Sequence, residues 1–400
     1  MTFKPLQATD VVSTRTLLHE AIPLTGTIVS GTYGDNNIKN YTHGMFQSVY
    51  DYPYLSSSAN HIFDLTVGYS SDSPLYTATT TATGQKAKKK NIYNQMCQVL
   101  MGYDATGSIL KFDEDGDIIG GGNKMNEVFI MPFSRLLVKD EIKKETFSMV
   151  LSISGTYWYR ELAPGTKDIF QNTITVSDVS ASTDYRVNSP VGEYGILYAT
   201  SSAQTVGGIG LNAVLSDTNI HTASIGGVKY WYAGLLFYQA GIAVLTASLF
   251  QQSVQGQLDT TPFGGTGEPD DFRFISGTVA AGTPYFKNVN EALTGSAISA
   301  SCDAFRHRIG NIQFNNTTEL NSTVYFCRAN HNEFNYSSNP TYVSGSKIRV
   351  KTQASDDPVA YITTVGLYND NNELMASAKL SEPLKKSPST EFTIRTRLDY

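Results

Sequence analysis

Residues 359–380 read VAYITTVGLYNDNNELMASAKL, and this stretch sets the interpretation of the rest of the chain. Val359 to Tyr368 is rich in β-branched residues and tyrosine, which favours an extended strand. Asn369 to Asn372 supplies residues that tolerate the left-handed backbone angles of a turn. Glu373 to Leu380 then forms the return strand. The stretch therefore predicts a β-hairpin.

Neighbouring stretches extend this hairpin into a sheet. Residues 321–328 and 346–352 have the composition of strands, and residues 391–398 (EFTIRTRL) alternate apolar and polar side chains. A strand so close to Tyr400 predicts that this residue is tied into the sheet. We expect residues 272–400 to form an antiparallel β-domain without a catalytic motif.

The composition points to a β-rich protein with broad protein contacts. Hydrophobic residues make up 40% of the 400 residues and charged residues 16%, where about 25% charged is typical. The surface must therefore use uncharged polar residues and tyrosine, of which there are 24. A formal net charge of −6 predicts no attraction to nucleic acid or to an anionic membrane.

We expect a mainly β fold of antiparallel β-sandwich domains with long loops and a minor helical element. The predicted segments are an N-terminal arm (1–20), a mixed α+β domain (21–155), a β-rich domain (156–262) and the C-terminal domain (272–400). A short helix over residues 14–20 is possible after Asp10 or Ser13 as a cap. Residues 91–103 place apolar side chains at helical spacing and predict the clearest helix.

The uncharged stretch from Tyr230 to Phe250 has the length of a membrane span. Gly241 separates two β-prone runs within it, which favours a buried hairpin. We therefore expect no membrane span.

Two charged runs allow competing interpretations. The lysines of residues 86–90 could contact phosphate, but a solvated start of the following helix is favoured. Residues 109–119 resemble a calcium loop counted from Asp113, yet its sixth and twelfth positions hold Ile118 and Lys124 instead of Gly and Glu. A hairpin with Asp115 and Gly116 at its turn is the favoured interpretation.

A zinc site is the main alternative that involves chemistry. Cys302, His307, Cys327 and His331 are all zinc-ligand types in two closely spaced pairs. Cys327, however, ends an alternating strand where a buried thiol is expected, and arginines flank His307. We expect no metal and no cofactor. The sequence also lacks a G-x-S-x-G nucleophile motif, and we expect no enzyme activity.

Aromatic clusters are the candidate contact residues, because rings provide contact area at little entropy cost. The loop of residues 331–342 is either a docking loop or a packed connection, and the sequence leaves both open. The interface candidates are Tyr41, Phe46, Tyr50, Tyr52, Tyr54, Phe334, Tyr336 and Tyr342.

Residues 333–342 (EFNYSSNPTY) and 363–386 (TTVGLYNDNNELMASAKLSEPLKK) resemble structural proteins of tailed bacteriophages, in particular large marine and cyanobacterial phages with contractile tails. Residues 43–70 and 314–340 share the likeness, which is carried by phrases and not by a catalytic motif.

The resemblance implies a tail or baseplate subunit of the virion, assembled in the host cytoplasm. It would bind other virion proteins and form a homo-oligomer within a symmetric assembly. A neck, collar or capsid-surface component is the alternative, as is a host-binding adhesin or carbohydrate-binding protein.

Overall fold

The chain forms two compact units. Unit 1 comprises Met1–Leu18 with Glu319–Tyr400, and unit 2 comprises His19–Thr318. The four-segment division expected from the sequence stays a prediction. The computed structural model describes residues 3–25, 37–51, 60–73, 76, 84–117, 122–154, 172–201, 205–206, 209–210, 221–250, 297–306, 309–336, 343–344, 347–348, 353, 355 and 357–400.

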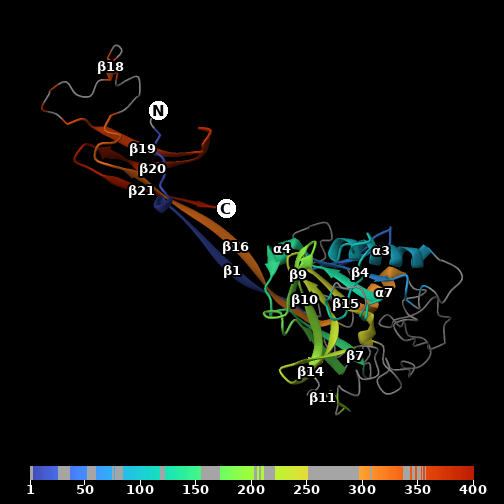
Figure 1. Cartoon of the computed structure of the whole chain (residues 1–400). Helices are drawn as coiled ribbons and strands as arrows, with labels where there is room; N and C mark the ends of the chain where they lie inside the picture. Colours follow the sequence, from blue (N-terminus) through green and yellow to red (C-terminus); the bar gives the residue numbers. More distant parts are fainter. Residues whose placement is uncertain are drawn as a thin grey trace. The chain divides into compact units, whose positions relative to one another are not determined.

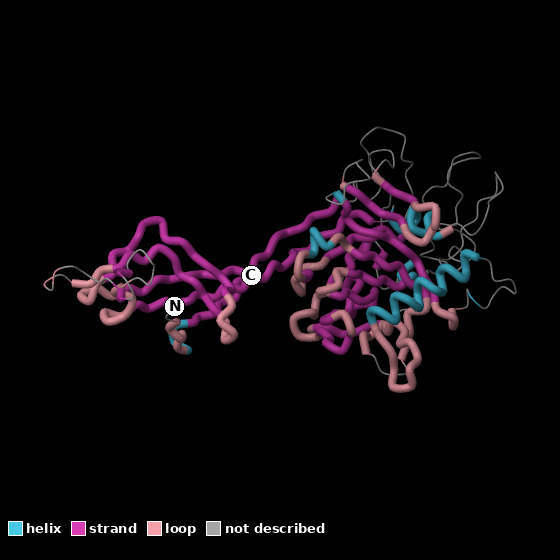
Figure 2. The backbone as a smooth tube through the Cα atoms, turned by 90° about the horizontal axis from the view of Figure 1, so that it is seen from above, coloured by secondary structure: helices cyan, strands magenta, loops and turns pink. Residues whose placement is uncertain are grey.

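Strands dominate the described residues, with few helices (Figure 2). The prediction of a mainly β protein with antiparallel sheets and a minor helical element is thereby confirmed. The elements are η1 (Ala8–Asp10), β1 (Val11–Thr25), β2 (Ile38–Asn40), β3 (Gln47–Tyr50), β4 (His61–Tyr69), α3 (Gly84–Leu100), β5 (Glu127–Pro132), α4 (Arg135–Val138), β6 (Glu141–Ile142), β7 (Ser148–Ser154), β8 (Asn172–Ser177), β9 (Tyr185–Ser189), β10 (Gly192–Ser201), β11 (Thr205–Val206), β12 (Ile209–Gly210), β13 (Thr222–Ile225), β14 (Val228–Phe237), β15 (Ile242–Thr246), η3 (Ala247–Phe250), α7 (Ile298–Arg306), β16 (Ile309–Ala329), β17 (Val343–Ser344), β18 (Lys347–Ile348), β19 (Ala360–Tyr368), β20 (Leu374–Lys386) and β21 (Phe392–Asp399).

Unit 2 is built on one large sheet. Its strands follow the order β16-β7-β8-β10-β14-β15-β5-β4-β3-β2, with β1 beside β16. Helices α3 and α7 both contact β4 (Figure 1). The strands at the centre of this order are buried along most of their length, as the hydrophobic runs of β14 and β15 require. The main core of the protein therefore lies in unit 2.

Helix α3 packs unusually close to β4 at Gly68. A Cβ atom at Gly68 would lie 3.0 Å from the backbone oxygen of Lys89 and 3.0 Å from the backbone nitrogen of Tyr93. Glycine is required here because only a missing side chain lets the helix backbone approach the strand so closely.

The expected hairpin over Tyr230 to Phe250 is confirmed. Strands β14 and β15 pair antiparallel, with Phe237 opposite Ile242 and Gly241 at positive φ in the turn between them. No helix in the described residues is long and apolar enough to cross a membrane.

The helix expected over residues 14–20 is wrong, because this segment belongs to β1. Ser13 Oγ lies 3.2 Å from Thr323 Oγ1, and Arg15 forms an ion pair with Glu319. Pairing with a strand three hundred residues away overrides the weak local capping signal.

The lysine run at the start of α3 is not simply solvated, contrary to the favoured interpretation. The helix begins at Gly84, and the side chains of Lys86 and Lys89 are buried. Burial lowers the pKa of Lys89 to about 8.

The hairpin expected within residues 109–119, with Asp115 and Gly116 at its turn, is wrong, because residues 112–114 pair with residues 123–125 instead. The Met125 N–H donates to the Phe112 oxygen, and the Glu114 N–H donates to the Asn123 oxygen. We call this pairing the 112–125 hairpin.

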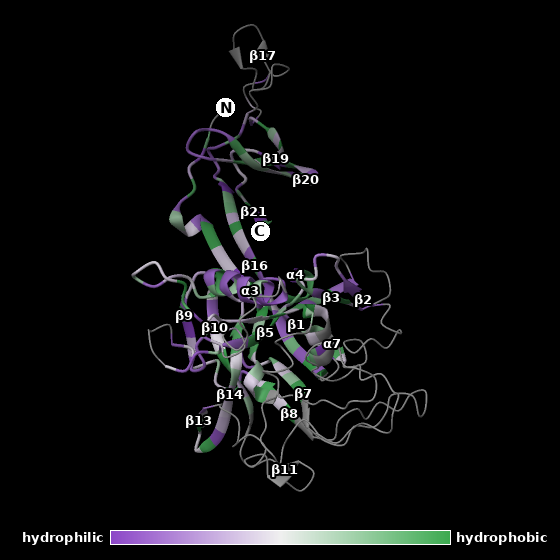
Figure 3. Ribbon diagram, turned by 90° about the vertical axis from the view of Figure 1, so that its right-hand side faces the viewer, coloured by the Kyte–Doolittle hydropathy of each residue, from purple (hydrophilic) through white to green (hydrophobic). Residues whose placement is uncertain are grey.

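In unit 1, β21 pairs antiparallel with β16 from Ser322–Asp399 to Ala329–Phe392, as part of the large sheet. The Tyr400 N–H donates to the Asn321 oxygen over 2.8 Å, as expected for a residue tied into the sheet. The described residues of unit 1 also form the two-stranded sheets β17–β18 and β19–β20, and the second of these is the hairpin predicted from residues 359–380. Hydrophobic stretches occur in the strands of both units (Figure 3).

Candidate assembly interface

Unit 1 buries very little apolar surface. Among its described residues, the hydrophobic side chains that are buried are Val324, Ala329 and Ala360. Thirteen of the nineteen large hydrophobic side chains exposed in the described chain also belong to unit 1. Exposed apolar residues gathered in this way mark a surface for protein contacts. Unit 1 is therefore the candidate assembly interface.

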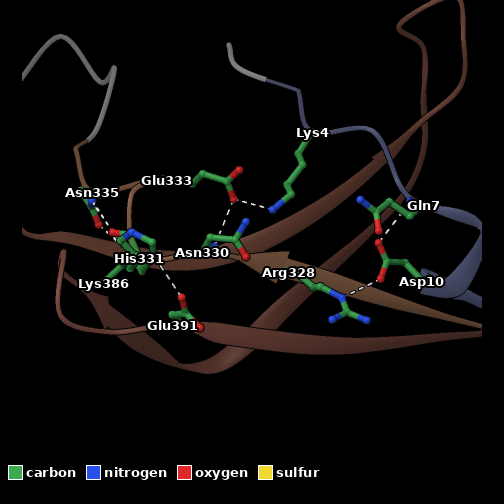
Figure 4. A network of polar contacts seen from close by, with 10 residues as sticks. All are labelled: Lys4, Gln7, Asp10, Arg328, Asn330, His331, Glu333, Asn335, Lys386 and Glu391. Atoms are coloured by element: carbon green, nitrogen blue, oxygen red, sulfur yellow. Dashed lines mark hydrogen bonds and ion pairs between the residues drawn. The ribbon is translucent and has the colours of Figure 1, made fainter.

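A polar network fastens the N-terminal segment to the loop after β16 (Figure 4). Lys4 forms an ion pair with Glu333, and Arg328 Nε donates to Asp10 Oδ1 over 2.6 Å. The Lys4 ammonium and the Asn330 N–H lower the pKa of Glu333. The Glu333 carboxylate is therefore held in its charged form, which strengthens its ion pair with Lys4.

Lys386 is the buried centre of this network (Figure 4). Its ammonium donates to Asn335 Oδ1 over 2.7 Å, to the Ser387 oxygen over 2.9 Å and to the His331 oxygen over 3.2 Å. Asn335 Nδ2 in turn donates to the His331 oxygen over 2.8 Å. Three oxygen partners satisfy all the donors of the ammonium and fix the loop of residues 330–336.

This fixed loop displays two of the predicted interface residues. Phe334 and Tyr336 are both exposed. Phe334 has a φ of 54°, a left-handed backbone angle that residues other than glycine rarely adopt. The surrounding hydrogen bonds hold it in that conformation. Such a rigid loop with outward aromatic rings fits a docking loop, while Tyr342 lies outside the described residues.

The β19–β20 hairpin presents a second apolar surface, which we call the hairpin face. Cross-strand partners share a face of a sheet. Tyr361 pairs with Lys385, and Tyr368 pairs with Leu374. The register shifts between these two pairs, and all four residues lie on the exposed side of the hairpin, opposite half-buried pairs such as Ile362–Leu384 and Leu367–Ala376. Tyr361, Tyr368 and Leu374 are 58%, 38% and 54% exposed. The sequence predicted this hairpin but gave no sign that its tyrosines stay exposed.

The upstream aromatic tract belongs to unit 2. The rings of Tyr41 and Phe46 lie 4.8 Å apart and are half-buried. Tyr50 is buried, so its ring packs in the interior and is not available to a partner. Tyr52 and Tyr54 lie outside the described residues.

The cysteines and histidines proposed for zinc have other surroundings. Cys302 is buried in unit 2, and its thiol lies 3.2 Å from the Leu65 oxygen. Cys327 is half-buried in β16 within unit 1. His331 Nδ1 lies 3.1 Å from Glu391 Oε1. His307 lies outside the described residues.

The acidic run in the 112–125 hairpin contains a possible cation site. Single oxygen atoms of Asp113, Asp115 and Asp117 lie within 4.8 Å of one another, the one such group among the described residues. Lys124, however, forms an ion pair with the fully buried Asp113. Its ammonium already supplies the positive charge that the buried carboxylate needs, so the group carries no metal proposal.

Comparisons of the chain with protein-family models, with curated proteins and with solved structures found no match.

Proposed function

We propose that the chain is a structural subunit of a tailed-bacteriophage virion, placed in the tail or baseplate, and that unit 1 attaches it to neighbouring virion proteins. The observation that carries this proposal is the near absence of buried hydrophobic side chains among the described residues of unit 1.

The energetics of folding explain why this observation matters. Fixing each residue costs about 1.5 kcal/mol of conformational entropy, which a domain normally offsets by burying apolar side chains. One valine and two alanines supply only a few kcal/mol. Unit 1 must draw on half-buried contacts and its polar network, and binding to neighbours would bury much of the rest.

The kind of assembly is suggested by the sequence. The phrases in residues 333–342 and 363–386 that resemble phage structural proteins lie in unit 1. They contain both the loop that displays Phe334 and Tyr336 and most of the hairpin face. The low charge and abundant tyrosine of the chain suit extensive protein contacts.

The alternative of a carbohydrate-binding adhesin gains no specific support. Trp231 is buried in unit 2 and cannot stack on a sugar ring, while Trp158 lies outside the described residues. The neck, collar and capsid surface remain alternative positions for the same structural role.

Mass spectrometry of purified particles from the source virus tests the proposal, with copy number measured against the major capsid protein. We expect a fixed copy number in multiples of three or six, and enrichment in tail fractions separated from capsids. Absence of the chain from purified particles would overturn the structural role.

Variants of the loop of residues 330–336 test the role of unit 1. Phe334→Ala and Tyr336→Ala should reduce incorporation into particles while leaving the melting temperature of the isolated chain nearly unchanged. Tyr103→Ala is the matched control, because Tyr103 is an equally exposed tyrosine of unit 2. Equal loss of stability and incorporation would assign these rings to folding instead.

A further inference from the structure

The hairpin face has apolar groups separated by small residues. Tyr361 lies near its base, and Tyr368 and Leu374 lie near its tip. Between them, Gly366 pairs with Ser377. Atoms of Tyr368 and Leu374 would lie 3.0 and 3.1 Å from a Cβ atom at Gly366, so both side chains lean over this glycine. The apolar group at the tip therefore extends over the middle of the face.

The N-terminal segment enlarges the apolar group at the tip. The rings of Phe3 and Tyr368 lie 4.8 Å apart in an edge-to-face arrangement. Phe3 is itself exposed. The tip therefore carries three neighbouring apolar side chains, which is the composition of an interface centre.

Charge is distributed unevenly along the hairpin. Lys379 and Lys385 are exposed towards its base, with Glu382 exposed between them, and Asp370 and Glu373 are exposed in the turn at its tip. The base of the hairpin therefore carries a net positive charge and the tip a net negative charge. A surface with this pattern complements a copy of itself turned end to end.

We propose that the hairpin face binds the same face of a second copy of this chain, related by a two-fold axis near the Gly366–Ser377 pair. This inference rests on the proposed function and specifies one of its contacts. The axis sets Lys379 and Lys385 of each copy near Glu373 and Asp370 of the other. It also sets Tyr361 of each copy near the tip of the other.

Contact between faces is favoured over pairing along the edge of β20. Pro383 lies within β20 and has no N–H to donate to an added strand. Lysines along the same strand further protect its edge. The face, by contrast, offers apolar side chains and complementary charges.

The size of the face sets the strength of the contact. Nine residues of strand span about 30 Å, and two strands with their side chains are about 10 Å wide, giving roughly 300 Å² per copy. A standard interface buries about 800 Å² per partner. The contact is therefore weak between free chains and is strengthened where several contacts act together in a symmetric assembly.

Charge-reversed variants of the full chain test the proposal by sedimentation velocity up to roughly millimolar concentration. The base variant carries Lys379→Glu and Lys385→Glu, and the tip variant carries Asp370→Lys and Glu373→Lys. Each variant alone should associate more than tenfold more weakly than the natural chain. A 1:1 mixture should associate again, because each reversed end then meets an oppositely charged end.

A zero-length carbodiimide cross-link provides an independent readout. A mixture of ¹⁵N-labelled and unlabelled natural chains should give mixed-isotope links between Lys379 and Glu373. Lys229→Glu, at an exposed lysine of unit 2, controls for the change in net charge and should leave association unchanged.

The results also separate this inference from the proposed function. Variants that associate like the natural chain, or an absence of mixed-isotope links at the highest concentration, would overturn the second-copy contact. If the chain is then present in particles with its hairpin cross-linked to another protein, the structural role stands and only the inference fails. Its absence from particles, with mixed-isotope links found in solution, would give the opposite result.

Discussion

Replacing Lys386 by methionine should lower the melting temperature of unit 1. The substitution keeps most of the side-chain volume but removes the ammonium that donates to three oxygen atoms. A hydrogen bond from a charged group contributes roughly 1.5–3 kcal/mol. Although the side chain is covered, little protein surrounds it farther out, so solvent weakens these interactions. We therefore expect a total loss of about 2 kcal/mol.

This loss corresponds to about 10 °C in the melting temperature of a unit of this size. Differential scanning calorimetry should show the transition of unit 1 moving while that of unit 2 stays in place. Amide hydrogen exchange of residues 330–336 should become faster, because the loop loses its central donor. Incorporation into particles should fall as well, since Phe334 and Tyr336 are no longer held in place.

The control is Lys385→Met, which removes an exposed lysine from the same strand. It should change the free energy of unfolding by no more than about 0.5 kcal/mol, and the melting temperature should change correspondingly little. If Lys386→Met melts at the same temperature as this control and exchanges no faster at residues 330–336, the network does not hold the loop.

Three further predictions concern unit 2. Burial raises the pKa of Asp178 to about 6; because the folded state favours the protonated form, the free energy of unfolding should fall by about 3 kcal/mol as the pH rises from 4 to above 6. Asp178→Asn should remove this component in urea unfolding at matched pH values, and a pH profile identical to that of the natural chain would contradict the assignment. Gly68→Ala should destabilise by about 1–3 kcal/mol through backbone overlap, whereas Gly84→Ala, with open space around it, should be neutral in the same thermal melt. Lys124→Met should destabilise by about 3–5 kcal/mol because Asp113 loses its counter-ion; adding Asp113→Asn should restore part of the stability, and additive losses in the double variant would refute this pairing.

The local elements were predictable where the hydrophobic pattern is strong. The turn chemistry of residues 369–372 and the glycine at 241 identified two hairpins correctly. The helical spacing of residues 91–103 identified α3, although the helix begins earlier, at Gly84. These signals are local in sequence, which is why they can be recognised without a structure.

Long-range pairing was not predictable in the same way. Residues 11–18 are separated from their partners in β16 by about three hundred residues of sequence. Without that pairing, the polar residues Asp10 and Ser13 look like caps of a short helix over residues 14–20. The burial of Lys86 was also missed, because a run of lysines is normally solvated.

The candidate interface was predictable only in part. Phe334 and Tyr336 were expected to lie at a contact, and both are exposed. The role of Lys386 could not be predicted, since nothing in the sequence Leu384-Lys385-Lys386 at the end of β20 distinguishes the buried lysine from the exposed one. The exposure of the hairpin tyrosines was not predicted. The alternation of side chains along a strand is the same whether one face of the strand is covered or neither is.

The two-part origin of unit 1 has a consequence for synthesis. Residues 1–18 leave the ribosome before the rest of this sequence, and the strand that pairs with them is made some three hundred residues later. At about 5–20 residues per second, the early segment waits roughly 15–60 s for that strand, while residues 19–318 can already fold. A chain that stops before residue 319 holds residues 1–18 but none of the rest of unit 1. Synthesis of residues 319–400 thus acts as a checkpoint, and only chains that pass it can acquire the assembly surface.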